Sequence, residues 1–154
     1  MIEKPKITNS PEQLIAMIHL TVARAEIRNV MGPGLSEIHA ALAAQGIAAA
    51  GSWFTHHLRM DPKVFDFEIC VPVKSPVSAA GRVTPGKTPD MKVVRTVYHG
   101  DYEALGAAWG EFDEWIKKEG LTTEPGLWER YTVGPESSPD PKAWRTELSR
   151  IISK

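Results

Sequence analysis

The sequence predicts an α+β fold: a duplicated strand-helix-strand-strand unit that forms one antiparallel sheet with two main helices on one face. The first observation is an apolar stripe of helical period in each half of the chain. The second is the alternation of apolar and polar residues in strand segments that follow the helices. The third is a near-constant offset between the halves, because Gly46 and Gly120 are 74 residues apart and Trp53 and Trp128 are 75 apart. Such a duplication leaves a groove between the two helices, where a ligand can bind.

Length and composition predict one domain over residues 1–154, with pseudo-repeats at about 12–74 and 81–153. The net charge is −1, from 18 basic and 19 acidic residues without a block of like charge, which argues against a nucleic-acid surface. The apolar runs are too short to span a membrane, and the N-terminus lacks a secretory signal pattern. We therefore expect a soluble, cytoplasmic protein. Cys70 is the only cysteine, which excludes an intramolecular disulfide.

The first half is expected to hold one strand, one helix and a hairpin. Residues 13–22 are rich in Ile, Leu, Val and Met and predict the first strand. The motif Gly32-Pro33-Gly34 interrupts a short helical turn, so the main helix is expected to begin near Pro33 and to end at Gly46. Two strands, at 53–60 and 64–73, are joined by Asp61-Pro62-Lys63 and are typical of a hairpin.

The second half repeats this order. Residues 82–89 predict a short edge strand or loop, and residues 91–99 predict a strand. Asp101 is the expected N-cap of an aromatic-rich helix that closes at Gly120, and the chain returns as a strand after Gly126. Residues 143–152 suit a strand or a short helix, and symmetry with 64–73 favours the strand.

Glu129 is the leading candidate for chemistry. Strand alternation places it on one face with Leu127 and Tyr131. If that face lines the groove, its apolar setting, with Tyr131 and Tyr98 nearby, raises the carboxyl pKa, and Glu129 becomes an ion partner for a cation or a general base. The alternative is a strand carboxylate that faces solvent or pairs with a basic residue. By the offset of 75, Phe54 stands at the matching position of the first half.

The five tryptophans supply flat apolar surface for a planar or cationic ligand. Trp109 suits either the core or a pocket wall, and Trp53 suits either the core or a stacking surface. Adjacent strand residues point to opposite faces, so His56 and His57 cannot converge on one metal ion. The sequence also lacks a glycine-rich phosphate loop and a nucleophile elbow. We expect neither a metal nor a cofactor.

Several short motifs together resemble the GyrI-like small-molecule-binding family, which also forms the effector-binding domain of AraC-type and MerR-type regulators. The resemblance spans roughly residues 14–152. Its motifs are Ala44-Gln45-Gly46-Ile47, Phe65-Asp66-Phe67-Glu68 with Val71-Pro72-Val73, Tyr98-His99-Gly100-Asp101-Tyr102-Glu103-Ala104-Leu105-Gly106 with Ala108-Trp109, and Trp128-Glu129-Arg130-Tyr131.

This resemblance implies a groove for amphipathic, aromatic or cationic compounds, with Glu129 as its carboxylate and Tyr98 as a pocket tyrosine. It also implies a stand-alone form without a DNA-binding module, so no direct contact with nucleic acid or membrane is expected. We expect Glu129, Tyr98, Tyr131, Trp109 and Trp53 to bind the ligand of a sensor, sequestering or drug-resistance protein.

Two other functions stay open. One is a hydrolase of electrophilic, cyclopropane-bearing genotoxic compounds, in which Glu129 activates water and Tyr98 donates a proton to the leaving group. The other is an adaptor that acts on a protein partner, such as DNA gyrase or a transcription regulator. The sequence does not decide whether the protein is an enzyme or whether it forms a homodimer.

Overall fold

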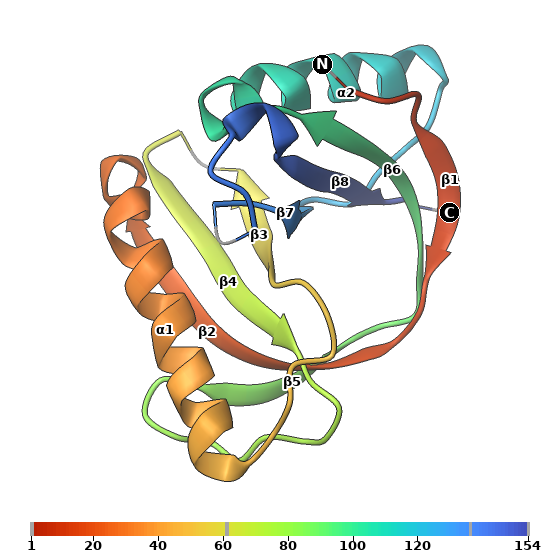
Figure 1. The fold of residues 1–154 in the computed structure, drawn as a ribbon. Coiled ribbons are helices and arrows are strands. Elements are labelled where there is room, and N and C mark those ends of the chain that lie inside the picture. Colours follow the sequence, from red (N-terminus) through yellow and green to blue (C-terminus); the bar gives the residue numbers. More distant parts are fainter. Residues whose placement is uncertain (1, 61, 136, 154) are drawn as a thin grey trace. The chain divides into compact units, whose positions relative to one another are not determined.

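The computed structural model describes residues 2–60, 62–135 and 137–153, and the chain divides into two compact units (Figure 1). The first unit is Pro11–Asp90. The second unit joins residues 2–10 to residues 91–153. Each unit contains antiparallel strands and one main helix, so the predicted α+β class is confirmed.

The first unit follows the predicted order of strand, helix, strand, strand. These elements are β2 (Gln13–Ala23), α1 (Ile27–Gln45), β3 (Phe54–Met60) and β4 (Val64–Pro72), with a further strand β5 (Thr84–Thr88) and a short 3-10 helix η1 (Arg24–Glu26). The strands lie side by side in the order β3-β4-β2-β5, and all pairs are antiparallel. The predicted hairpin of β3 and β4 is therefore confirmed, although Asp61 in its turn lies outside the described residues.

The second unit has the same order of elements. It contains β6 (Met91–His99), α2 (Leu105–Lys118), β7 (Leu127–Val133) and β8 (Arg145–Ile151), together with β1 (Lys6–Ser10) and the 3-10 helices η2 (Tyr102–Ala104) and η3 (Pro141–Ala143). The strand order is β1-β6-β8-β7, again antiparallel throughout. The segment at 143–152 is thus a strand, as symmetry with 64–73 predicted.

The two repeats exchange one flanking strand each. β1 precedes β2 in the chain but pairs with β6 of the second unit, while β5 precedes β6 but pairs with β2 of the first unit. The exchanged strands take equivalent places, because each pairs with the opening strand of the repeat that it does not precede. The sequence predicts no strand before residue 13, so β1 was not expected.

The start of α1 differs from the prediction. The helix begins at Ile27 and continues through Pro33, which the sequence analysis placed at its first position. Proline removes one helical hydrogen bond, but this cost is outweighed by packing. Gly34 is buried against β4, where a Cβ atom would lie only 2.6 Å from Cδ1 of Ile69. The motif Gly32-Pro33-Gly34 therefore brings the helix close to the sheet instead of ending it.

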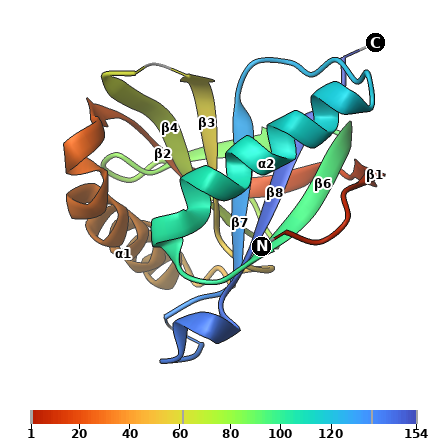
Figure 2. The same cartoon turned by 90° about the horizontal axis from the view of Figure 1, so that it is seen from above.

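Each unit has its own core between its main helix and one face of its strands. In the first unit, α1 lies along β2 and β4 and buries Ile38 and Leu42 against apolar strand residues (Figure 1). In the second unit, α2 crosses β6, β8 and β7 (Figure 2). Its buried residues are Ala108, Trp109, Phe112 and Ile116.

Candidate functional site

Glu129 lies on the face of β7 that α2 covers. The β7 register places it beside Leu148 of β8, a core residue, and its strand neighbours on the same face are Leu127 and Tyr131. Only 8% of Glu129 is exposed, so the alternative of a solvent-facing strand carboxylate is wrong. A buried carboxylate requires hydrogen-bond donors, because an unpaired charge in an apolar core is costly.

Two neutral donors hold the carboxylate of Glu129. The indole Nε1–H of Trp109 donates to Oε2 at 2.6 Å, and the hydroxyl of Tyr131 donates to Oε1 at 2.7 Å. Trp109 reaches it from α2, where the helix packs on the sheet, and Tyr131 reaches it from two residues along the same strand. A short hydrogen bond to each oxygen fixes the orientation of the carboxylate.

Burial dominates the electrostatics of this group. Removal from water raises the pKa of Glu129 above its usual value, while the hydrogen bonds from Tyr131 and Trp109 lower it and offset part of that rise. Burial therefore makes ionisation of Glu129 costly, and the two hydrogen bonds offset part of that cost. A group in this state can accept a proton from bound water or can attract a cation.

An aromatic cluster lies beside the Tyr131 end of the carboxylate. Tyr102 from η2 packs edge-on against Tyr131, with ring centroids 5.9 Å apart at 81°. Trp144, which immediately precedes β8, stacks on Tyr102 at 5.0 Å and 30°, and its Nε1–H donates to the carbonyl of Ser138 at 2.9 Å. The sequence analysis missed Tyr102 and Trp144 as site residues. The position of Tyr102, directly after the capping Asp101 and therefore at the start of the helical segment, could have indicated that it lies near the site.

Tyr98 lies on the same face but at the far side of β8. Its partner in the register is Thr146, which also pairs with Tyr131, so two strand spacings of about 4.8 Å separate the tyrosine backbones. Burial and the negative charge of Asp101 raise the pKa of Tyr98. Between the two tyrosines, the buried Thr146 Oγ1 has no hydrogen-bond partner among the described residues.

Of the five predicted binding residues, the structure brings Glu129, Trp109 and Tyr131 into direct contact. Tyr98 shares their face of the second unit. Trp53 belongs to the first unit, where it packs against the core of that unit, and its binding role stays a prediction.

The strand register also corrects the predicted counterpart of Glu129. Phe54 pairs with Cys70, on the face away from the core under α1, while Thr55 pairs with the core residue Ile69. The helix-facing counterpart of Glu129 is therefore Thr55. Thr55 and Glu129 are 74 residues apart, the same offset that separates the helix-closing glycines Gly46 and Gly120.

Two further features of the described ranges bear on function. No helix within them is long and apolar enough to cross a membrane. No group of three or more His, Cys, Asp or Glu side chains in the same ranges is arranged to hold a metal ion.

Comparison with solved structures shows shared folds at low sequence identity. The C-terminal domain of EcmrR has a TM-score of 0.87 at 20% identity, with 98% of each chain covered. EcmrR in a complex with DNA also gives 0.87 at 19% identity, covering 98% of this chain, which spans about 57% of that one. A hydrolase from Listeria innocua gives 0.67 at 13% identity over 97% and 92% of the two chains. SAV2435 bound to tetraphenylphosphonium gives 0.66 at 10% identity over 98% and 94%.

Among curated proteins, no sequence matches significantly. The family model of the GyrI-like small molecule binding domain, however, matches residues 3–149, almost the entire chain. The chain therefore belongs to the GyrI-like small-molecule-binding domain family.

Proposed function

We propose that this domain binds a hydrophobic, cationic aromatic small molecule at Glu129 and acts as a sensor or sequestering protein for such compounds. The observation that carries the proposal is the buried Glu129 carboxylate, which is fixed by Trp109 and Tyr131 and lies beside the aromatic pair Tyr102 and Trp144. This combination offers both a negative charge and flat apolar surface.

A cation with apolar substituents suits such a site better than a neutral or anionic ligand. Ionisation of Glu129 is disfavoured by burial, and a bound positive charge recovers that cost through a Coulomb interaction in a medium of low polarity. Aromatic faces attract cations as well and bury apolar groups. The Thr146 hydroxyl, which has no hydrogen-bond partner among the described residues, offers one polar contact on the same face.

The comparison with SAV2435 supports the ligand class, because that relative of the same fold was solved with tetraphenylphosphonium, a cation with four phenyl groups. The likeness to the C-terminal domain of EcmrR is consistent with a domain of this fold serving within a larger protein. Both relatives are too distant to transfer a ligand, so the Glu129 site of this chain supplies the chemistry.

A thermal-shift screen with tetraphenylphosphonium and the neutral triphenylphosphine oxide tests the proposal. The wild type is expected to be stabilised by the cation, by about 2.7 kcal/mol at 100 times its Kd. Glu129→Gln keeps the size of the side chain but removes its charge, so the cation should lose most of its effect. The matched control is Glu124→Gln, an exposed glutamate just before β7. Equal stabilisation of wild type and Glu129→Gln would contradict the proposal.

A second candidate function is hydrolysis of an electrophilic, cyclopropane-bearing compound. It is favoured by the raised pKa of Glu129, since a more basic carboxylate is a stronger general base, and by the fold shared with a Listeria innocua hydrolase. Tyr98 would be the proton donor from across β8. Mass spectrometry after the screen separates the two functions: an intact ligand indicates binding, and a hydrated product formed by wild type but not by Glu129→Gln indicates catalysis.

A further inference from the structure

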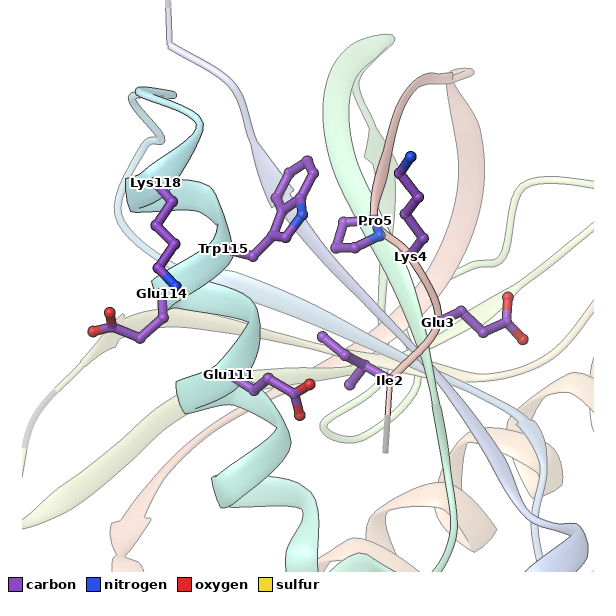
Figure 3. Close-up of a pocket in the computed structure, with 8 residues that line it drawn as sticks. All are labelled: Ile2, Glu3, Lys4, Pro5, Glu111, Glu114, Trp115 and Lys118. Atoms are coloured by element: carbon purple, nitrogen blue, oxygen red, sulfur yellow. The ribbon is translucent and has the colours of Figure 1, made fainter.

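A second surface of the molecule lies away from Glu129, between the N-terminal residues 2–5 and α2. It is a groove of about 510 Å³ lined by eight residues: Ile2, Glu3, Lys4, Pro5, Glu111, Glu114, Trp115 and Lys118 (Figure 3). Figure 3 shows Trp115 reaching from α2 toward Pro5 and Ile2 reaching from the opposite wall. Both Ile2 and Trp115 pack against the core of the second unit but remain half-exposed.

The N-terminal wall of the groove is a fixed part of the fold. The backbone N–H of Glu3 donates to the carbonyl of Val97 at 2.9 Å, and Thr96 Oγ1 donates to the carbonyl of Glu3 at 2.6 Å. A bridge between Ile2 and Tyr98 continues this pairing. The groove is therefore held open by β6 and is present before any partner binds.

The exposed charges near Trp115 on α2 change sign along the helix. Glu111 lies four residues before Trp115 and Lys118 three residues after it, the steps that place side chains on one stripe of a helix, and Glu114 lies at the edge of this stripe, four residues before Lys118. Glu111, Glu114 and Lys118 are exposed, and none of them forms an ion pair with another described residue. Glu114 and Lys118 have the spacing for a pair within the helix and do not make it.

When two copies of α2 lie antiparallel, the acidic end of this stripe on one helix faces the basic end on the other. Glu111 and Lys118 lie equally far from the midpoint between Glu114 and Trp115. A two-fold axis through that midpoint places Glu111 of one copy opposite Lys118 of the other, twice, and places Trp115 of each copy opposite Glu114 of the other, so that the two Trp115 side chains flank the axis between the charge pairs. A two-fold interface requires such self-complementarity, and an apolar centre with a charged rim is the usual anatomy of an interface.

We propose that two copies of this chain associate through antiparallel α2 helices, with Trp115 and Ile2 at the centre of the interface and Glu111–Lys118 pairs at its rim. The occupant of the groove is thus a second copy of the chain. The proposal is independent of the ligand chemistry at Glu129, because it uses the outward face of α2.

Sedimentation analysis at low ionic strength, over protein concentrations up to the millimolar range, tests the association. The wild type is expected to be a dimer that weakens with salt. Glu111→Lys places like charges opposite each other at both rim positions and should weaken the dimer by about tenfold or more. Lys118→Glu should do the same, and the double variant Glu111→Lys/Lys118→Glu should restore association because the two charges are exchanged.

Lys117→Glu is the matched control, since it makes the same charge change on a neighbouring exposed residue outside the stripe. Circular dichroism of each variant verifies that it folds, and these exposed positions leave the core intact. A wild type that stays monomeric throughout would overturn the proposal. So would a dimer that resists both single reversals, a double variant without recovery, or a Lys117→Glu variant as disruptive as Lys118→Glu.

Discussion

Removing the Tyr131 hydroxyl tests how the Glu129 carboxylate is held. Tyr131→Phe keeps the ring and its contact with Tyr102 but deletes the 2.7 Å hydrogen bond to Oε1. A hydrogen bond to an ionised group contributes about 1.5–3 kcal/mol, against about 0.5–1.5 for one between neutral groups. The bond therefore favours ionised over protonated Glu129 by about 1 kcal/mol, and its loss should raise the Glu129 pKa further.

The raised pKa of Glu129 also determines how the stability of the protein changes with pH. Because burial raises the Glu129 pKa, the folded protein holds this proton more tightly than the unfolded chain does. Its stability therefore falls as the pH rises from about 4.5, the unfolded value, through the folded-state pKa. Tyr131→Phe should be more destabilising above that window than below it, by about 1 kcal/mol.

Two measurements verify this prediction. A carbon-13 NMR titration of the Glu129 carboxyl reports its pKa directly, and urea denaturation at acidic and alkaline pH reports the stability difference. Tyr98→Phe is the control, since Tyr98 lies across β8 and does not bond to Glu129. An unchanged pKa in Tyr131→Phe, with equal destabilisation at both pH values, would refute the described geometry.

The remaining predictions concern stability. Gly106→Ala and Gly110→Ala should each stabilise the protein by up to about 1 kcal/mol in thermal denaturation, because a Cβ at either position in α2 meets open space. Gly100→Ala should instead destabilise it, since Gly100 has φ +137° and its Cβ would lie 2.9 Å from the Tyr98 hydroxyl oxygen. A Gly106→Ala variant less stable than wild type would contradict the first statement.
Burial is the main cause that lowers the pKa of His57 from 6.5 to about 4, and the charges of His56 and Arg24 lower it as well. The neutral imidazole of His57 therefore contributes its full stabilisation above pH 6.5, and the protein loses this stabilisation as the pH falls from 6.5 to about 4. That loss amounts to about 3 kcal/mol, and an imidazole NMR titration midpoint near 6.5 would disprove it.

The parts of the fold that the sequence predicted are those with strong local signals. β4 alternates between apolar and polar residues, β6 is rich in β-branched residues, and α2 follows a capping aspartate, Asp101, whose Oδ1 accepts from the Glu103 N–H at 3.1 Å. The start of α1 was mispredicted because Gly32-Pro33-Gly34 breaks helices locally, while the close packing of Gly34 on Ile69 is a tertiary effect. β1 was not predicted for a related reason, because it pairs with β6, a strand that is far away in the sequence.

The sequence likewise predicted only part of the candidate site. Strand alternation identified the shared face of Glu129 and Tyr131 correctly. It could not show that the Trp109 indole points at the carboxylate, because the rotation of α2 is set by its core packing. Nor could it join Tyr102 to Trp144, since this stacking depends on how the η3 loop folds back toward η2. The assignment of Phe54 failed because a one-residue shift moves a strand residue to the opposite face.

The most direct test of the central claim is calorimetric titration of tetraphenylphosphonium into wild type and Glu129→Gln across a range of pH. If the ionised Glu129 carboxylate binds the cation, wild-type affinity should fall as the pH drops through the Glu129 pKa, by up to tenfold per pH unit. Proton release on binding should appear in buffers of different ionisation enthalpy, and Glu129→Gln should bind weakly at every pH. Equal, pH-independent affinities for the two proteins would contradict the claim that Glu129 recognises the ligand.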